Sequence, residues 1–134
     1  MFAIHPRLAA DTVAVLEWRL CHVLLMNDRT FPWLILVPAR NNVAEIHHLD
    51  APERSLLVEE IARASRVLLD MTRADKINTA ALGNVVPQLH VHVIARFQHD
   101  PAWPKPVWGA QPPSPYDRDE LSEMLARLRR RLSA

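Results

Sequence analysis

The sequence predicts an α+β domain: an antiparallel five-stranded sheet with one long helix after strand three and a C-terminal helix. Three observations predict this class. Short apolar segments with strand-like patterning follow one another near the start of the chain, a helical period replaces them in the middle, and strand-like alternation then returns. Because strands joined by short turns pair antiparallel and helices gather on the sheet, this order is typical of an α+β fold.

The size and composition of the chain suit one ordinary domain. Its 134 residues can bury one hydrophobic core, so we expect a single domain over residues 1–134. The net charge of +1 gives no general attraction to nucleic acid or to anionic membranes. A single cysteine, Cys21, excludes an internal disulfide and fits a reducing, cytoplasmic environment. The start of the chain lacks the pattern of a signal peptide, and no apolar run approaches the ~18 residues of a membrane span.

Residues 11–18, 21–26 and 33–37 are predicted to form the first three strands. A polar turn at 27–30 ends the second strand and leaves a connection short enough for an antiparallel hairpin with the third. The third strand is almost wholly apolar, which is typical of a central strand covered on both faces, and Pro38 marks its end.

A long helix is predicted to begin after Asp50 and to end near Thr72. Asp50 is a suitable N-cap, Pro52 fits the first turn, and Glu53 lies three residues after the cap. This helix should cover one face of the sheet. Its apolar stripe, at spacings of three and four residues, consists of Leu57, Ile61, Ala64, Leu68 and Met71.

Two further strands are predicted at 76–82 and 89–95, separated by the break at Gly83. A proline-rich segment follows, and its residues Trp103 and Trp108 indicate a loop that packs on the protein rather than a disordered linker. This loop and a last helix occupy residues 100–134. The apolar stripe of the last helix consists of Leu121, Leu125, Leu128 and Leu132.

The strand around residues 88–94 carries the candidate chemistry. Its polar residues Gln88, His90 and His92 form a row with steps of ~7 Å on one face, while the alternate apolar residues face the core. An imidazole with a pKa of about 6.5 is a good nucleophile near neutral pH, so His90 could attack a phosphoryl centre and form a covalent intermediate. His92 and the amide of Gln88 could hold phosphate oxygens as charge develops. The turn at Gly83 could offer backbone N–H groups to the phosphate.

A metal site is the alternative interpretation of the same residues. His90 and His92 could take two coordination positions of a zinc ion, which would require a third ligand. The candidates for that ligand are His47, His48 and His99. A metal-dependent enzyme therefore remains open at this point.

The segment from Gln88 to Ile94 resembles the signature of the histidine triad (HIT) superfamily of nucleotidyl hydrolases and transferases. That signature is His-φ-His-φ-His-φ-φ, where φ is apolar, and two of its three histidines and all four apolar positions match. Arg96 follows, as in many members. Residues 26–38 also resemble the family's paired strands that end in a Val-Pro step, so the resemblance covers roughly the core at residues 11–109.

The resemblance implies a HIT-like fold and a role for each matching residue. His90 would be the nucleophile toward a nucleoside α-phosphate, through a covalent nucleotidyl-histidine intermediate. His92 would contact the phosphate, and Asn27 or Asp28 would bind the ribose hydroxyls. Asn84 would lie in the loop on the phosphate side.

The resemblance also implies ligands and an assembly. Purine nucleotides, dinucleoside polyphosphates or nucleoside phosphoramidates would be the ligands, with no cofactor or metal required, and the chain would form a homodimer. Three positions depart from the family pattern: Gln88 stands at the first histidine, Trp33 at a further histidine, and Val85 at a serine or threonine. A catalytically weak nucleotide-binding or regulatory module is therefore an alternative.

Overall fold

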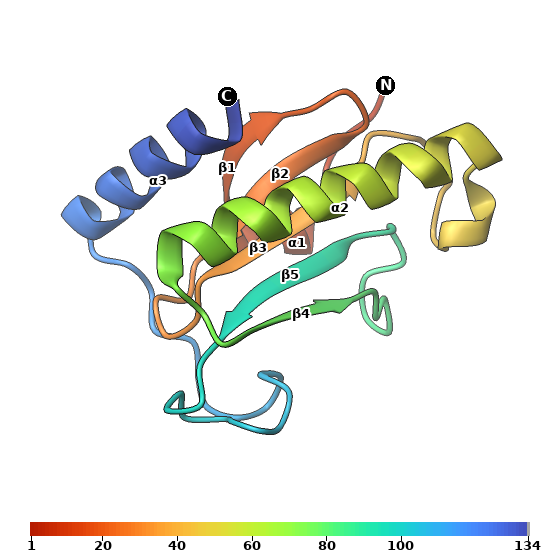
Figure 1. Ribbon diagram of the computed structural model, residues 1–134. Coiled ribbons are helices and arrows are strands. Elements are labelled where there is room, and N and C mark those ends of the chain that lie inside the picture. Colours follow the sequence, from red (N-terminus) through yellow and green to blue (C-terminus); the bar gives the residue numbers. More distant parts are fainter. Residues whose placement is uncertain (134) are drawn as a thin grey trace.

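The computed structural model describes residues 1–133 and contains one antiparallel sheet with the strand order β1-β2-β3-β5-β4 (Figure 1). The predicted fold class is confirmed. In chain order the elements are α1 (Pro6–Asp11), β1 (Thr12–Glu17), β2 (Cys21–Met26), β3 (Trp33–Pro38), the 3-10 turn η1 (Ile46–His48), α2 (Ala51–Thr72), β4 (Lys76–Ala80), β5 (Val91–Arg96) and α3 (Arg118–Ser133).

The hairpin and the central strand are as the sequence predicts. β2 and β3 pair antiparallel, with Cys21 opposite Pro38 and Leu25 opposite Leu34. β3 lies between β2 and β5, and every one of its residues is buried. The continuous apolar sequence of β3 is therefore explained by the packing of both faces of this strand.

Helix α1 was not predicted, Asp11 belongs to it rather than to the first strand, and two strand limits were wrong by two residues. α1 begins at a proline, and the His5 ring caps it by accepting a hydrogen bond from the Arg7 N–H (3.1 Å). β4 ends at Ala80 rather than at residue 82. β5 begins at Val91 rather than at residue 89, because the Leu89 N–H donates to the carbonyl of Val43 in a loop and not to a neighbouring strand.

Helices α2 and α3 cover one face of the sheet, which we call the helix face (Figure 1). The Asp50 carboxylate caps α2 by accepting the N–H of Glu53 (2.9 Å), and Arg73 in the left-handed conformation (φ 58°) ends the helix. Within residues 1–133, no helix combines the length and the apolar character needed to cross a membrane. The apolar helix residues buried on this face are Leu57, Ala64, Leu68, Leu128 and Leu132.

The opposite face carries the motif histidines, and we call it the histidine face. Chain segments with little regular structure cover it: the N-terminal segment with α1, and a loop over residues 97–117 that we call the Trp/Pro loop. Its apolar cluster is centred on Trp33, Ile35, Val37 and Ile94 of the sheet, with Leu8, Phe31, Val86, Ala102 and Val107 packed on them.

One buried ion pair anchors the Trp/Pro loop to the sheet. The Arg96 guanidinium donates to both carboxylate oxygens of Asp100 (2.9 and 3.1 Å) and also to Asn78 and to the carbonyl of Lys105. Burial of the Asp100 carboxyl opposes its ionisation, but Arg96 and three backbone N–H groups outweigh burial and hold the pKa of Asp100 well below its usual range. The loop is therefore held by charge and not by its prolines alone.

Candidate active site

His90 and His92 are buried on the histidine face, with exposed fractions of 7% and 5%. The sequence pattern predicts that they point away from the core formed by Leu89 and its apolar neighbours. This is correct for the helix face, but the other side of the sheet is also packed. The two rings lie 5.0 Å apart between centroids, so they can act on one group.

The backbone of Gln88 sets the protonation of His90. Nδ1 of His90 lies 2.7 Å from the carbonyl oxygen of Gln88. Because a carbonyl only accepts, Nδ1 must carry the hydrogen in this contact. In the neutral ring Nε2 then keeps its lone pair, which is the state that a nucleophile needs.

Trp33 sets the opposite protonation of His92. The indole Nε1–H of Trp33 donates to Nδ1 of His92 over 3.0 Å, and an indole can only donate. Neutral His92 therefore carries its hydrogen on Nε2. Burial, with a smaller contribution from His90, lowers the pKa of His92 to about 4, so the ring stays neutral near pH 7. The two histidines thus form one acceptor and one hydrogen-bond donor.

Two tryptophans surround His92. The ring of Trp108, from the Trp/Pro loop, lies 5.0 Å from that of His92 and 5.8 Å from that of Trp33 in edge-on contacts. Trp108 is 37% exposed, whereas Trp33 is buried. Trp108 therefore forms the outer wall of the site, and Trp33 its inner support.

A cavity of about 460 Å³ lies beside Trp33, which links it to His92. This volume suits a small organic ligand. Asn27 and Asp28, the residues predicted to bind the ribose hydroxyls, line it. The other residues that line it are Arg7, Ala10, Asp11, Met26, Pro113 and Pro115.

The side chains of Asn27 and Asp28 also hold the Trp/Pro loop. Oδ1 of Asn27 accepts the N–H of Tyr116 (3.0 Å), and Oδ1 of Asp28 accepts the N–H of Ser114 (3.2 Å). These contacts leave the Asn27 amide N–H groups and the second oxygen of Asp28 for a ligand. The pocket therefore depends on a loop far away in sequence.

The loop before β5 brings Gly83 next to His90. Both residues line a narrow crevice, and the positive φ of Gly83 (71°) favours glycine there. Asn84 is exposed in the same loop but does not line the crevice. The structure thus brings one of the two predicted loop residues to the histidines.

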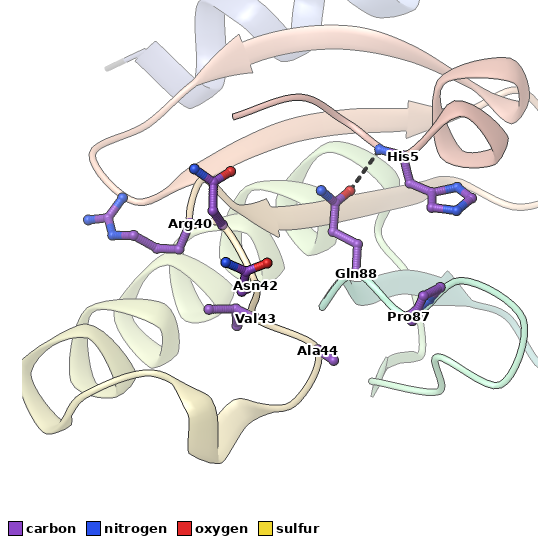
Figure 2. Close-up of a pocket in the computed structure, with 8 residues that line it drawn as sticks. His5, Arg40, Asn42, Val43, Ala44, Pro87 and Gln88 are labelled. Atoms are coloured by element: carbon purple, nitrogen blue, oxygen red, sulfur yellow. Dashed lines mark hydrogen bonds between the residues drawn. The ribbon is translucent and has the colours of Figure 1, made fainter. Parts of the chain in front are cut away.

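The side chain of Gln88 is engaged elsewhere. Its carboxamide oxygen accepts the N–H of His5 (2.8 Å), as Figure 2 shows, and its nitrogen donates to the carbonyl of Ala3 (2.8 Å). The pocket in that view, about 310 Å³ in volume, lies between this contact and the loop from Arg40 to Ala44. Gln88 therefore binds the N-terminal segment, a role that the motif alone does not suggest.

In the described part of the chain, no third metal ligand joins the histidine pair. Among residues 1–133, no three His, Cys, Asp or Glu side chains are placed to share a metal ion. The rings of His47 and His48 meet edge-on in η1, with centroids 4.5 Å apart, and His99 lies against Phe97.

Several residues of the site carry no signal in a single sequence. By pattern alone, Trp33 does not differ from the other apolar residues of a central strand. Asp100 likewise does not differ from other acidic residues in a loop. A short helix at residues 6–11, which carries Arg7, is too brief for a periodic pattern. Only the departure from the histidine pattern at Trp33 pointed to a position worth examining.

Comparisons with known proteins identify the family and the fold. The family model described as HIT domain matches residues 7–99. A histidine triad protein from Marinobacter aquaeolei VT8 shares 50% identity over 99% of this chain and 97% of its own, with a TM-score of 0.97. One from Bradyrhizobium japonicum shares 46% identity over 98% of each chain, with a TM-score of 0.95.

A hypothetical histidine triad nucleotide-binding protein from Sulfolobus tokodaii shares only the fold, with 16% identity over 95% of this chain and 87% of its own and a TM-score of 0.71. No curated protein matches the chain. The family match and the two close structures, taken with the paired histidines on β5, show that this chain belongs to the histidine triad (HIT) family.

Proposed function

We propose that this chain cleaves a bond at a nucleoside α-phosphate through a covalent nucleotidyl-histidine intermediate. The observation that supports it is the opposite protonation of two neighbouring imidazoles. His90 presents a lone pair on Nε2, and His92 presents an N–H at the same position. This pair supplies a nucleophile and, beside it, a hydrogen-bond donor that can stabilise the charge developing on phosphate.

The reaction has two displacements. Nε2 of His90 attacks phosphorus, the bond from phosphorus to the leaving oxygen or nitrogen breaks, and the leaving group takes the electron pair and then a proton from solvent. His92 donates Nε2–H to a non-bridging oxygen as negative charge develops. Water then attacks phosphorus, the bond from phosphorus to Nε2 breaks, and the water proton passes to solvent.

The cavity beside Trp33 is the proposed place of the nucleoside. It adjoins His92 through Trp33, so a phosphate at the histidines would leave the sugar near Asn27 and Asp28. The distant Sulfolobus tokodaii protein with this fold is described as nucleotide-binding. Dinucleoside polyphosphates and nucleoside phosphoramidates are the substrate classes that we propose, with purine bases.

Rapid quenching followed by mass spectrometry tests the proposal. Wild-type protein mixed with an adenosine or guanosine phosphoramidate should gain the mass of one nucleotidyl group on the peptide that contains His90. His90→Ala should show no such gain, and His22→Gln, which alters a histidine paired with Glu17 outside the site, should label as wild type does. Turnover by His90→Ala would exclude His90 as the nucleophile.

A nucleotide-binding module without turnover is the second candidate. It is favoured by the contact of Gln88, which stands at the first motif histidine but cannot deliver a proton at neutral pH and holds Ala3 and His5 instead. Calorimetry with a nucleoside monophosphate, together with product analysis for both substrate classes, separates the candidates. Binding with no product from any substrate would favour the module.

We also propose that two copies associate through β4. The other edge strand, β1, is blocked because the Arg129 guanidinium donates to the carbonyls of Ala14 and Val15 at a bulge (2.9 and 2.8 Å). β4 has exposed residues and pairs with β5 on one side only. Light scattering should give twice the mass of the chain, and Thr79→Pro on β4 should reduce it to one copy. A monomeric wild type would refute the dimer.

A further inference from the structure

Gln88 fastens the N-terminal segment to the start of the motif strand. Its oxygen accepts from the His5 N–H and its nitrogen donates to the Ala3 carbonyl, both over 2.8 Å. The two contacts use the same pattern as a pair of strand hydrogen bonds, so one side chain fixes both the position and the direction of the segment. The segment also packs Phe2 and Ile4 on the histidine face.

The fastened segment leads directly into α1. The His5 ring accepts the N–H of Arg7, and Leu8 is buried in the apolar cluster beneath. At the far end of α1, the carbonyl of Asp11 accepts the N–H of Asn27 (3.0 Å). The short helix is thus held at both ends and presses one side against the sheet.

The free side of α1 faces the cavity beside Trp33. Arg7 and Asp11 both line that cavity, together with Ala10. They are four residues apart, so they lie on the same side of the helix, one above the other. Between residues 1 and 133, no ion pair or side-chain hydrogen bond occupies either charged group, although they could reach each other. The cavity therefore has one unused cation and one unused carboxylate in its wall.

We infer that Gln88 is a positioning residue that holds α1 against the cavity, where Arg7 and Asp11 recognise guanine in the bound nucleotide. The inference rests on the proposed function for placing a nucleoside there. Gln88, at the first motif position, would then act in base selection and would not contact phosphate.

Guanine is the base whose edges match this pair of charges. A guanidinium offers only donors, and guanine presents N7 and O6 as two adjacent acceptors, whereas adenine presents N7 beside a donor amino group. A carboxylate only accepts, and guanine offers N1–H and N2–H on its other edge. Adenine has a lone pair at N1, which would face the carboxylate of Asp11 unfavourably.

Binding of GMP and AMP, measured by calorimetry, tests the base preference. Wild type should bind GMP about tenfold more tightly than AMP, since a bidentate contact to guanine cannot form with adenine. Arg7→Ala should lose this preference by weakening GMP alone. Arg66→Ala removes an exposed arginine of α2 on the helix face and should leave both affinities unchanged.

The possible failures are distinguishable. Equal affinity of wild type for GMP and AMP, or an equal loss for both in Arg7→Ala, would overturn the inference while the proposed function stands. No binding of either nucleotide would overturn both.

A double-mutant cycle tests the role of Gln88. Gln88→Met keeps the length of the side chain and removes the amide, so it should abolish the GMP preference as Arg7→Ala does. The double variant should be no weaker toward GMP than either single variant, because both act through the same contact. If Gln88 instead touched phosphate, Gln88→Met would weaken GMP and AMP equally, and its effect would add to that of Arg7→Ala.

Discussion

The two faces of the sheet are built in different ways. On the helix face, α2 and α3 bury stripes of leucine and alanine, and one buried carboxylate, that of Glu60 on α2, accepts the N–H groups of Leu20 and Cys21. On the histidine face, irregular segments are fastened by single polar side chains, each with its own partners: Gln88 holds the N-terminal segment, and Asp100 anchors the Trp/Pro loop.

This difference separates stability from function within one domain. An apolar stripe tolerates exchange of similar residues because burial is not directional. A fastening such as that between Arg96 and Asp100 depends on particular atoms, and it positions Trp108 beside His92. We therefore expect substitutions on the helix face to change stability, and those on the histidine face to change activity or both.

The largest expected effect is that of His90→Ala on turnover. Loss of the proposed nucleophile should lower kcat by at least about 10⁴-fold, because the remaining groups cannot form the proposed covalent intermediate. Leu68→Ala on α2 should reduce stability by about 2–5 kcal/mol, yet leave kcat near that of wild type at a temperature where it is folded. Steady-state assays with thermal unfolding check both. A large loss of kcat in Leu68→Ala would contradict the expectation that substitutions on the helix face change stability and not activity.

Asp100→Ala should combine both kinds of damage. It leaves the Arg96 guanidinium buried without its anion, a change that costs about 3–5 kcal/mol, and it releases the Trp/Pro loop. Denaturant unfolding should show the loss of stability, and calorimetry should show weaker nucleotide binding. If binding at a temperature where the variant is folded equalled that of wild type, the loop would not support the site.

The Asp100 carboxylate also predicts a dependence on pH. Its pKa in the folded chain lies below its unfolded value of about 3.9, so its contribution to stability is present above that pH and is lost as pH falls through the folded pKa. The stability difference between wild type and Asp100→Asn should therefore shrink below about pH 4. A constant difference down to pH 2 would contradict the ion pair.

The same contrast explains what could be predicted from the sequence. The stripe from Leu57 to Met71 with its cap at Asp50 determines α2, because period and cap are local properties of the chain. The row of His90 and His92 was evident because a strand alternates its faces. That both histidines are buried was not evident, since their cover comes from the N-terminal segment and the Trp/Pro loop, which lack a regular pattern.

Individual tertiary hydrogen bonds could not be predicted from a single sequence, for a physical reason. The contact of Gln88 with Ala3 joins residues far apart in the chain, and nothing local to either residue encodes the other. Trp33 was identified only as a departure from the family's histidine. Its hydrogen bond to His92 depends on the register of β3 against β5, which sets Trp33 opposite Ile94.

Acid should destabilise the protein through His92. Because the folded pKa is about 4 and the unfolded value about 6.5, the unfolded chain binds the extra proton first as pH falls. Stability should decrease between about pH 6.5 and pH 4, by up to ~1.4 kcal/mol per pH unit. His92→Gln, which can still accept from Trp33, should show a flatter slope in denaturant unfolding over that range. Equal slopes would contradict the lowered pKa.

Trp33→Phe should free Nδ1 of His92 while keeping an aromatic ring. The hydrogen of the neutral imidazole would then distribute over both nitrogens, and we expect kcat to fall about tenfold with little change in KM. Nitrogen-15 spectra of labelled histidine should show one tautomer of His92 in wild type and a mixture in the variant. A single unchanged tautomer would mean that Trp33 only fills space.

Trp108→Ala should have the smallest effect of this series. Its ring is partly exposed and meets His92 and Trp33 edge-on, so its removal costs about 1 kcal/mol of aromatic contact and opens the outer wall of the site to water. Nucleotide affinity should fall about fivefold, and stability should fall by no more than about 1 kcal/mol. Trp108→Phe should restore most of the affinity, which calorimetry can measure. A loss as large as that of Asp100→Ala would mean that Trp108 itself, rather than the ion pair beneath it, holds the loop on the histidine face.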